Sequence, residues 1–287
     1  MYDLTDINFV KSILSKYGFK FSKALGQNFI IDSEICPQMA RLSGIDDNCG
    51  VIEIGPGIGV LTKELSLRAK KVVAIELDTH LLPLLSETLK PFDNIKIINA
   101  DVLKIDLKEL IKNEFGDMPV YVCANLPYYI TSPVIMKLLE EKSGIKSVTV
   151  MVQREAAQRL CASVGSRLSG AITAAVNYYS KPQLLFDVAK ECFIPAPKVD
   201  SSVIRLDILD KPSVECDNPD LFFKIISAAF SQRRKTALNS ISSGTGFSKE
   251  EIENALVCCE KKVTDRAEGF SLEDFARISD ILGNKNG

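Results

Sequence analysis

The sequence lacks the residues on which several classes of enzyme and metalloprotein depend. Among its 287 residues there is no tryptophan and only one histidine, His80, which lies in a helix-like stretch. The eight cysteines include no CxxC pair, and only Cys258 and Cys259 are adjacent. A zinc site and a histidine-based nucleophile triad therefore lack their parts, so we expect no metal. We expect the cysteines to be buried, reduced thiols and His80 to lie on the surface.

Long apolar runs and an excess of positive charge are also missing. No run reaches the roughly 18 apolar residues that a membrane span needs. The opening MYDLTDINFVKSIL lacks the basic segment and apolar core of a signal peptide. We therefore expect a cytoplasmic protein with no membrane partner. The net charge of −2 argues against a surface coated with positive charge, so any contact with a nucleic acid must be local.

The chain instead shows a regular alternation of short apolar strands and amphipathic helices. Its length suits one large α/β domain followed by a smaller one. The alternation predicts a parallel, doubly wound, Rossmann-like sheet, whose ligands bind at the carboxyl ends of the strands. The expected strands are 51–55, 72–75, 95–98, 120–124 and 148–152, and the clearest helices are 60–67, 81–89 and 134–141.

Residues suited to a nucleoside fall at these carboxyl ends. The glycine-rich turn at 55–59 allows a ligand to come close to the backbone, with Gly55 and Gly57 as its first two glycines. Glu76 is placed to hold the two hydroxyls of a ribose, and Asp101 is placed to meet an adenine edge. The sequence therefore predicts a cofactor that contains a nucleoside.

The details of the glycine turn distinguish between such cofactors. Its glycines are spaced as GxGxG and not as the GxGxxG of dinucleotide sites, and Pro56 removes an amide that could bind phosphate. Glu53, just before the turn, can attract a positively charged cofactor directly or through the local field. These features favour S-adenosylmethionine, which has a sulfonium and no phosphate, over NAD.

The stretch Asn125-Leu126-Pro127-Tyr128-Tyr129 follows the fourth expected strand. Pro127 steers Leu126 to an extended conformation, so that the Leu126 carbonyl can project beside the Asn125 side chain. These two acceptors can take both hydrogens of an exocyclic amine while Tyr128 stacks on the ring, and we expect Tyr129 to be packing. By itself the stretch also fits a strand-to-helix turn with asparagine as a helix cap and both tyrosines in the core.

The first forty residues contain the segment KYGFKFSKALGQNFIID, in which lysines alternate with phenylalanines. Lys16, Lys20 and Lys23 bring positive charge, and a turn is expected at 26–28. We interpret the segment as an arm folded over another part of the protein. A disordered terminus is the alternative.

Three later segments are candidates for contact with a nucleic acid. Arg154 and Arg159, at the start of a helix, can face a phosphate backbone, and residues 231–235, SQRRK, form the densest basic run. Solvated helix faces are the alternative for both. In FIPAPKVD, residues 193–200, Phe193 can supply the second face of a base sandwich, unless the loop is only a rigid connector. Polar, turn-rich residues after 211 mark a boundary, which predicts domains 1–211 and 218–287, the second all-helical.

Eight segments occur in one order between residues 23 and 241: KALGQNFIID, VIEIGPGIGVLT, VVAIELD, NADVLKID, NLPYYITSPVI, MVQREAAQRL, FIPAPKVDSSVIRL and FSQRRKTALNSI. Together they resemble the ribosomal RNA adenine dimethyltransferases of the KsgA type. The resemblance implies a class I methyltransferase fold with S-adenosylmethionine as methyl donor. It also implies a monomeric enzyme that dimethylates N6 of two adjacent adenosines near the 3′ end of 16S rRNA, within the immature small (30S) subunit.

Combined with the chemistry of the residues, the resemblance gives three groups of site residues. The catalytic group, which holds the target base, is Asn125, Leu126, Pro127, Tyr128 and Phe193. The cofactor group is Asn28, Ile30, Gly55, Gly57, Glu76, Asp101 and Asn125. The candidate RNA contacts are Lys23, Arg154, Arg159, Arg233, Arg234 and Lys235, so the helical domain would contribute to RNA or ribosome binding.

Other functions share part of this pattern. The dimethylase that modifies large-subunit (23S) RNA and confers macrolide resistance has the same core motifs, but its usual basic composition is absent here. A mainly non-catalytic ribosome assembly factor would keep the pocket only as structure, and the intact NLPYY argues against it. An N6-adenine DNA methyltransferase would share the Asn-x-Pro-Tyr pattern but not the remaining motifs.

Overall fold

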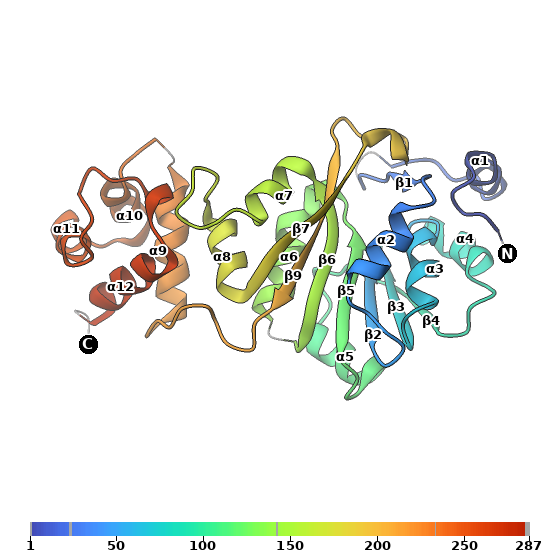
Figure 1. Ribbon diagram of the computed structural model, residues 1–287, viewed down its shortest axis with the longest axis horizontal. Helices are drawn as coiled ribbons and strands as arrows, with labels where there is room; N and C mark the ends of the chain where they lie inside the picture. The colour runs from blue at the N-terminus through green and yellow to red at the C-terminus, as the bar shows by residue number, and fades with distance from the viewer. Residues whose placement is uncertain (1, 23–24, 142, 233, 285–287) are drawn as a thin grey trace. The chain divides into compact units, whose positions relative to one another are not determined.

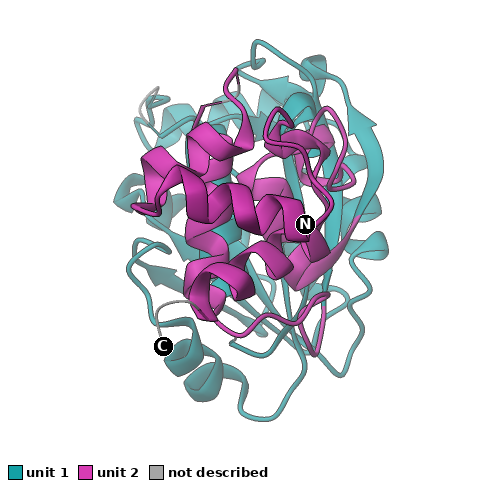
Figure 2. Ribbon diagram, turned by 90° about the vertical axis from the view of Figure 1, so that its left-hand side faces the viewer, with its two compact units in different colours: residues 1–157, 183–208 teal, residues 158–182, 209–287 magenta. Residues whose placement is uncertain are grey.

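Figure 1 presents the computed structural model, which describes residues 2–22, 25–141, 143–232 and 234–284. The chain folds as two compact units, residues 1–157 with 183–208 and residues 158–182 with 209–287 (Figure 2). The second unit therefore includes a segment, 158–182, that the expected boundary near 211 assigns to the first domain. The physical reason is aromatic packing, because the ring of Tyr178 lies 5.2 Å from that of Phe222 and 5.0 Å from that of Phe223.

Unit 1 is built on a sheet whose strand order is β4-β3-β2-β5-β6-β9-β7. Neighbouring strands from β4 to β6 pair in parallel, which confirms the predicted α/β, Rossmann-like sheet. β9 pairs antiparallel with β6, unlike the all-parallel expectation. The strands are β2 (Gly50–Ile54), β3 (Lys71–Glu76), β4 (Ile95–Asn99), β5 (Val120–Asn125), β6 (Ile145–Gln153), β7 (Ser180–Val188) and β9 (Ser201–Ile208).

The central strands are apolar because helices flank the sheet. β2 is buried over its whole length, and β3 is buried at every position after its first. Such continuous burial is expected of parallel strands that are covered on both faces. The flanking elements are α1 (Ile7–Lys16), α2 (Ile35–Leu42), α3 (Val60–Ser66), η1 (Thr79–Leu81), α4 (Leu82–Thr88), α5 (Leu107–Phe115), η2 (Tyr128–Ile130), α6 (Thr131–Glu140), α7 (Arg154–Leu160) and η3 (Lys190–Cys192).

The amino-terminal arm is ordered through its described residues and folds onto unit 1. β1 (Phe29–Ile30) pairs antiparallel with β8 (Phe193–Ile194) in a two-stranded sheet. The ring of Phe29 lies 5.8 Å from that of Phe19 and 5.3 Å from that of Phe21. This aromatic cluster confirms the folded arm and removes the alternative of a disordered terminus. Lys23 lies outside the described residues.

Unit 2 is helical, as predicted for the carboxyl-terminal part. Side chains at four helix starts accept backbone N–H groups, namely Asn218, Thr236, Ser248 and Ser271, and the two serines form capping boxes with acidic residues. Its helices are α8 (Ala171–Tyr179), α9 (Pro219–Ser231), α10 (Ala237–Thr245), α11 (Lys249–Cys258), η4 (Ala267–Gly269) and α12 (Leu272–Gly283).

The cysteines and the lone histidine lie mostly where the sequence predicts. All eight cysteines are free, and Cys36, Cys49, Cys123 and Cys259 are buried. Cys161, Cys192 and Cys216 are only partly buried, and the prediction of buried thiols is wrong for Cys258, which is exposed at the end of α11. The side chain of His80 is 84% exposed, which confirms its surface position. Within the described ranges, no helix is long and apolar enough to span a bilayer, and no three acidic, cysteine or histidine side chains gather as metal ligands.

Candidate functional site

A pocket opens at the carboxyl edge of the sheet, where most of the predicted site residues meet. Its wall is formed by the arm, its floor by the end of β2 and the glycine turn, and its far side by the segment that follows β5. An adjoining pocket contains Asp101 and shares Gly55 with the first. The predicted residues that line the first pocket are Asn28, Ile30, Gly55, Gly57, Glu76, Asn125, Leu126, Pro127 and Tyr128.

The glycine turn lets the arm and the sheet approach each other closely. Gly57 has a φ of +61°, which favours glycine, and a Cβ built at this position would lie 3.1 Å from the Phe29 ring. Gly59, with a φ of +93°, begins α3, and its Cβ would lie 2.8 Å from the Leu89 side chain. A side chain at Gly57 would require the Phe29 ring of the arm to shift, and one at Gly59 would require the Leu89 side chain to shift.

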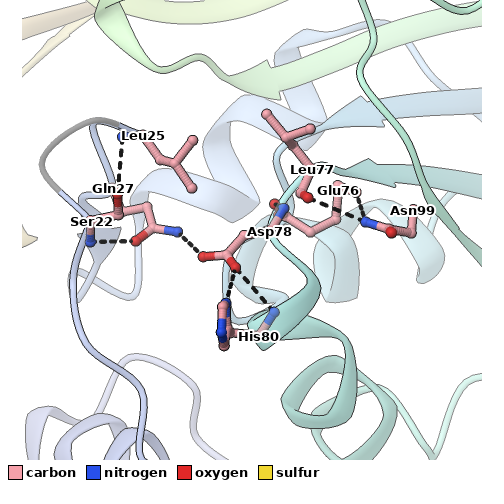
Figure 3. Close-up of polar contacts among 8 residues, drawn as sticks. All are labelled: Ser22, Leu25, Gln27, Glu76, Leu77, Asp78, His80 and Asn99. Atoms are coloured by element: carbon pink, nitrogen blue, oxygen red, sulfur yellow. Dashed lines mark hydrogen bonds and ion pairs between the residues drawn. The ribbon is translucent and has the colours of Figure 1, made fainter.

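Glu76 is the last residue of β3, and a side chain from the neighbouring strand β4 holds its backbone. Its Oε1 accepts a hydrogen bond from the Asp78 N–H at 2.7 Å. Asn99 Nδ2 donates to the Glu76 carbonyl at 2.8 Å and to the Leu77 carbonyl at 3.3 Å (Figure 3). Burial raises the pKa of Glu76 to about 7, so its carboxylate is costly to ionise until a ligand donates hydrogen bonds to it.

The arm is fastened beside Glu76 by Gln27, which the sequence analysis placed only in a turn. Gln27 Nε2 donates to Asp78 Oδ2 at 2.7 Å, and its Oε1 accepts from the Ser22 N–H at 2.9 Å (Figure 3). Asp78 also accepts from the His80 N–H at 3.0 Å. Burial acts to raise the pKa of Asp78, but hydrogen bonds from Gln27 and His80 outweigh it and lower the pKa. In the sequence, Asp78 could have been recognised as an acidic residue that lies just after a strand and immediately before a helical turn.

Glu53 is the most unusual group in the pocket. Its side chain is 1% exposed, and its Oε2 has no hydrogen-bond partner among the residues that the structure describes. Burial raises the pKa of Glu53 to about 8. A hydrogen bond with Thr62 acts to lower this pKa but is outweighed by burial. A buried carboxyl with one oxygen left unbonded is unfavourable by itself, and a cationic ligand in the pocket would relieve it.

The segment after β5 presents acceptors to the same pocket. Asn125 Nδ2 donates to the Asn28 carbonyl at 3.4 Å, an arrangement that leaves Oδ1 as a free acceptor. The Leu126 N–H donates to the Met151 carbonyl at 3.2 Å, and the Leu126 side chain is buried. Leu126 therefore contributes through its backbone. Pro127, with φ of −56° and ψ of 130°, precedes η2 as expected for a bend.

The two tyrosines of this segment have different surroundings. Tyr128 is partly buried, lines the pocket and shares a 2.7 Å hydrogen bond with Ser201 Oγ. The prediction that Tyr129 is packing is wrong, because its side chain is 54% exposed and lines the adjoining pocket instead. Neither η2 nor α6 has a side-chain cap bond in the described structure, so Asn125 is not a helix cap.

The structure does not bring the remaining predicted residues into this pocket. Phe193 is 3% exposed in β8 and is absent from the residues that line the pocket. Arg154 pairs with Asp200 at 3.1 Å and with Asp187 at 3.5 Å, so its charge is already partnered. Five residues later, Arg159 lies about 140° around an ideal helix, so the two arginines do not share one face.

The basic run contains exposed positive charge. Arg234 and Lys235 are exposed in the turn between α9 and α10, and Arg233 lies outside the described residues. A role in RNA binding for this run stays a prediction, as it does for Lys23.

Comparisons with known proteins identify the family of the chain. The model of the ribosomal RNA adenine dimethylase family matches residues 18–282. The chain is 46% identical over 276 residues to ribosomal RNA small subunit methyltransferase A of Bacillus pumilus, covering 95% of this chain and 94% of that protein. It is 44% identical over 283 residues to the protein of the same name from Clostridioides difficile, covering 98% of each.

Solved structures agree on the fold. The 23S rRNA methyltransferase ErmE superposes with a TM-score of 0.67 at 25% identity, over 89% of this chain and 99% of that one. A dimethyladenosine transferase from Plasmodium falciparum superposes with a TM-score of 0.70 at 23% identity, over 87% and 95% of the two chains. With the family model matching most of its length, the chain belongs to the ribosomal RNA adenine dimethylase family.

Proposed function

We propose that the protein transfers methyl groups from S-adenosylmethionine to N6 of two adjacent adenosines near the 3′ end of small-subunit (16S) ribosomal RNA, giving N6,N6-dimethyladenosine. The observation that carries the proposal is the orientation of Asn125. Its amide nitrogen is engaged by the Asn28 carbonyl, so its oxygen is left to accept a hydrogen bond in a pocket that also holds the unbonded Oε2 of the buried Glu53. The names of the relatives that are 44–46% identical support the small subunit as substrate.

The residues of the pocket fit S-adenosylmethionine. Glu76 is placed for the ribose hydroxyls, and Asp101, in the adjoining pocket, for the adenine edge. The unpaired Oε2 of Glu53 suits the positive charge of the cofactor. When bound, the cofactor supplies an electrophilic methyl group on a sulfonium.

The protein groups act by orienting the amine of the target. The N6 lone pair of adenine is delocalised into the ring, so the amine is a poor nucleophile while it stays planar. Acceptors at Asn125 Oδ1 and the Leu126 carbonyl favour a tetrahedral amine and aim its lone pair into the pocket. Positioning and electrostatics therefore account for the catalysis. Double methylation requires that the same acceptors still admit the monomethylated amine.

The target base must leave its stack to reach this place. A base edge in stacked RNA is inaccessible, so the adenine is splayed out and its ring is held by an aromatic face. Tyr128 lines the pocket and supplies that face. A second face from Phe193 stays a prediction, because its side chain is buried against the arm. Exposed Arg234 and Lys235 are placed to bind phosphates of the surrounding RNA.

Two other functions make different predictions for the same pocket. A large-subunit dimethylase would use the same acceptors, and the 25% identity to ErmE compares with 44–46% to the small-subunit relatives. A non-catalytic assembly factor would have no need for a free acceptor beside a cofactor pocket.

A panel of substrates tests the proposal. The protein and a labelled methyl donor are incubated with small subunits from cells that lack the modification, with mature small subunits, with large subunits and with duplex DNA. After digestion, we expect labelled dimethyladenosine only from the unmodified small subunits. Label in the large subunits or the DNA, or none in any substrate, would contradict the proposal.

A further inference from the structure

The hydroxyl of Tyr128 is anchored to the sheet by a residue outside the NLPYY motif. It lies 2.7 Å from Oγ of Ser201, the first residue of β9, whose side chain is fully buried. Ser201 is in register with Gln153, the last residue of β6. The anchor therefore sits at the carboxyl end of β6, beside the strand that carries Asn125.

The strand end that carries Ser201 is itself held by Arg154. The Arg154 N–H donates to the Asp200 carbonyl at 3.0 Å, and its guanidinium pairs with the Asp200 carboxylate at 3.1 Å. The same guanidinium reaches Asp187 on β7 at 3.5 Å. Asp200 also accepts from the Lys190 N–H at 3.1 Å. These contacts join α7, β7 and the start of β9 at one point.

The ring of Tyr128 has few other constraints. It belongs to η2, a single turn in which the Ile130 N–H donates to the Pro127 carbonyl at 3.1 Å. A tyrosine on such a short turn can adopt several rotamers unless its hydroxyl is fixed. The bond to Ser201 selects one ring orientation, and a stacking face has to be oriented before it can align a base.

We infer that Ser201 is a positioning residue that fixes the Tyr128 ring for stacking on the target adenine, and that Arg154 positions Ser201 instead of binding RNA phosphate. The inference rests on the proposed function. It assigns a role to the serine that follows FIPAPKVD and a different role to an arginine that the sequence places among the RNA contacts. Both act through Tyr128 and do not touch the reacting atoms.

A double-mutant cycle tests the Ser201 contact. We expect Tyr128→Phe and Ser201→Ala each to lower the single-turnover methylation rate about tenfold, a loss smaller than the roughly 10²-fold that a misplacement of about 1 Å can cause. The double variant should lose no more than either single variant, because both remove the same bond. Ser201→Thr should restore the rate, and affinity for S-adenosylmethionine should be unchanged throughout. If Ser201→Ala does not fold, Tyr128→Phe tests the same bond from the other side.

Ser147→Ala is the matched control. Ser147 is a buried serine of the same sheet, and its Oγ donates to the Ser43 carbonyl at 3.4 Å near the opposite end of β6. Its variant should keep the methylation rate. Single variants within about twofold of wild type, or losses that multiply in the double variant, would overturn the inference. An active wild type with unaffected variants contradicts the positioning role alone, whereas an inactive wild type contradicts the proposed function as well.

The salt dependence of RNA binding tests the role of Arg154 separately. A phosphate contact adds to the slope of RNA affinity against salt concentration, while an internal ion pair does not. We expect Arg154→Gln to lower the methylation rate and to leave the salt dependence of RNA binding unchanged. A flatter salt dependence with a normal rate would return Arg154 to the RNA contacts.

Discussion

Glutamates at the two edges of the parallel sheet have different surroundings and opposite pKa shifts. At the amino edge, Glu114 accepts from Lys96 Nζ at 2.5 Å and from Lys71 Nζ at 3.0 Å, and these bonds lower its pKa. At the carboxyl edge, burial raises the pKa of Glu53 to about 8 and of Glu76 to about 7. Glu114 has its cations within the fold, whereas neither acid of the pocket pairs with a cation among the residues that the structure describes.

This contrast indicates which edge is built for a ligand. A buried carboxyl without a cation destabilises the folded protein, so a fold keeps one where something else compensates. The glycine turn, the arm and the NLPYY segment all converge on that edge and none on the other. We expect a cationic nucleoside cofactor to restore the stability lost at the carboxyl edge when it binds.

The largest expected effect is at Asn125. Asn125→Ala removes an acceptor for the target amine, and we expect the methylation rate to fall by at least about 10²-fold while RNA binding is kept. Single-turnover kinetics and filter binding measure the two quantities. Asn94→Ala is the control, because Asn94 lies at the amino edge and donates to the Ser66 and Ala69 carbonyls. Near-normal turnover by Asn125→Ala would refute the acceptor role.

The next prediction compares Glu76, at the carboxyl edge, with Glu114, at the amino edge. Glu76→Gln removes a charged acceptor for the ribose, and we expect affinity for S-adenosylmethionine to fall about tenfold by calorimetry. Glu114→Gln should leave that affinity unchanged and lower the unfolding temperature, because it breaks bonds to Lys71 and Lys96. Equal cofactor affinity in the two variants would remove the distinction between the edges.

The contact between arm and sheet should have a smaller effect. Gln27→Ala loses the bond to Asp78, and we expect cofactor affinity to fall about fivefold, the scale of one hydrogen bond. In an Asp78→Asn background the same change should add little further loss, because the two variants remove one interaction. Independent, multiplying losses would show that Gln27 does not act through Asp78.

The last effect is on stability, which is a separate scale from activity. The pKa of Glu53 is raised in the folded state, so its contribution is present below about pH 4.5 and is lost as the pH rises through about 8. Glu53→Gln should therefore differ little in stability from wild type at about pH 4 without ligand. By about pH 9 it should unfold several degrees higher, because ionising a carboxyl with so raised a pKa costs several kcal/mol. A difference that does not grow with pH would contradict a Glu53 that is costly to ionise.

The parts of the fold that the sequence predicts are those that depend on local patterns. Strands β2, β3 and β5 are largely apolar runs, and their carboxyl ends meet because parallel strands share an edge. The position of Gly55, Glu76 and Asn125 at one edge of the sheet could therefore be predicted from the sequence alone. The helical nature of the carboxyl-terminal part follows in the same way from helical periodicity.

Contacts between residues that are far apart in the sequence have no such local pattern. Gln27 and Asp78 are 51 positions apart, and Tyr128 and Ser201 are 73 apart, so neither hydrogen bond has a local signature. The pairing of Arg154 with Asp200 also has no local signature, and the role of Arg154 in RNA binding stays a prediction. The prediction that Tyr129 is packed was wrong because an aromatic residue beside a strand end can be either packed or exposed.

The most direct test of the central claim is the position and extent of methylation in small-subunit RNA. Unmodified small subunits are incubated with the protein and excess S-adenosylmethionine, and the RNA is mapped by mass spectrometry. We predict two adjacent N6,N6-dimethyladenosines near the 3′ end with wild-type protein and a strong loss of both with Asn125→Ala. Monomethyladenosine as the final product, methylation elsewhere, or equal methylation by both proteins would contradict this assignment of the carboxyl edge.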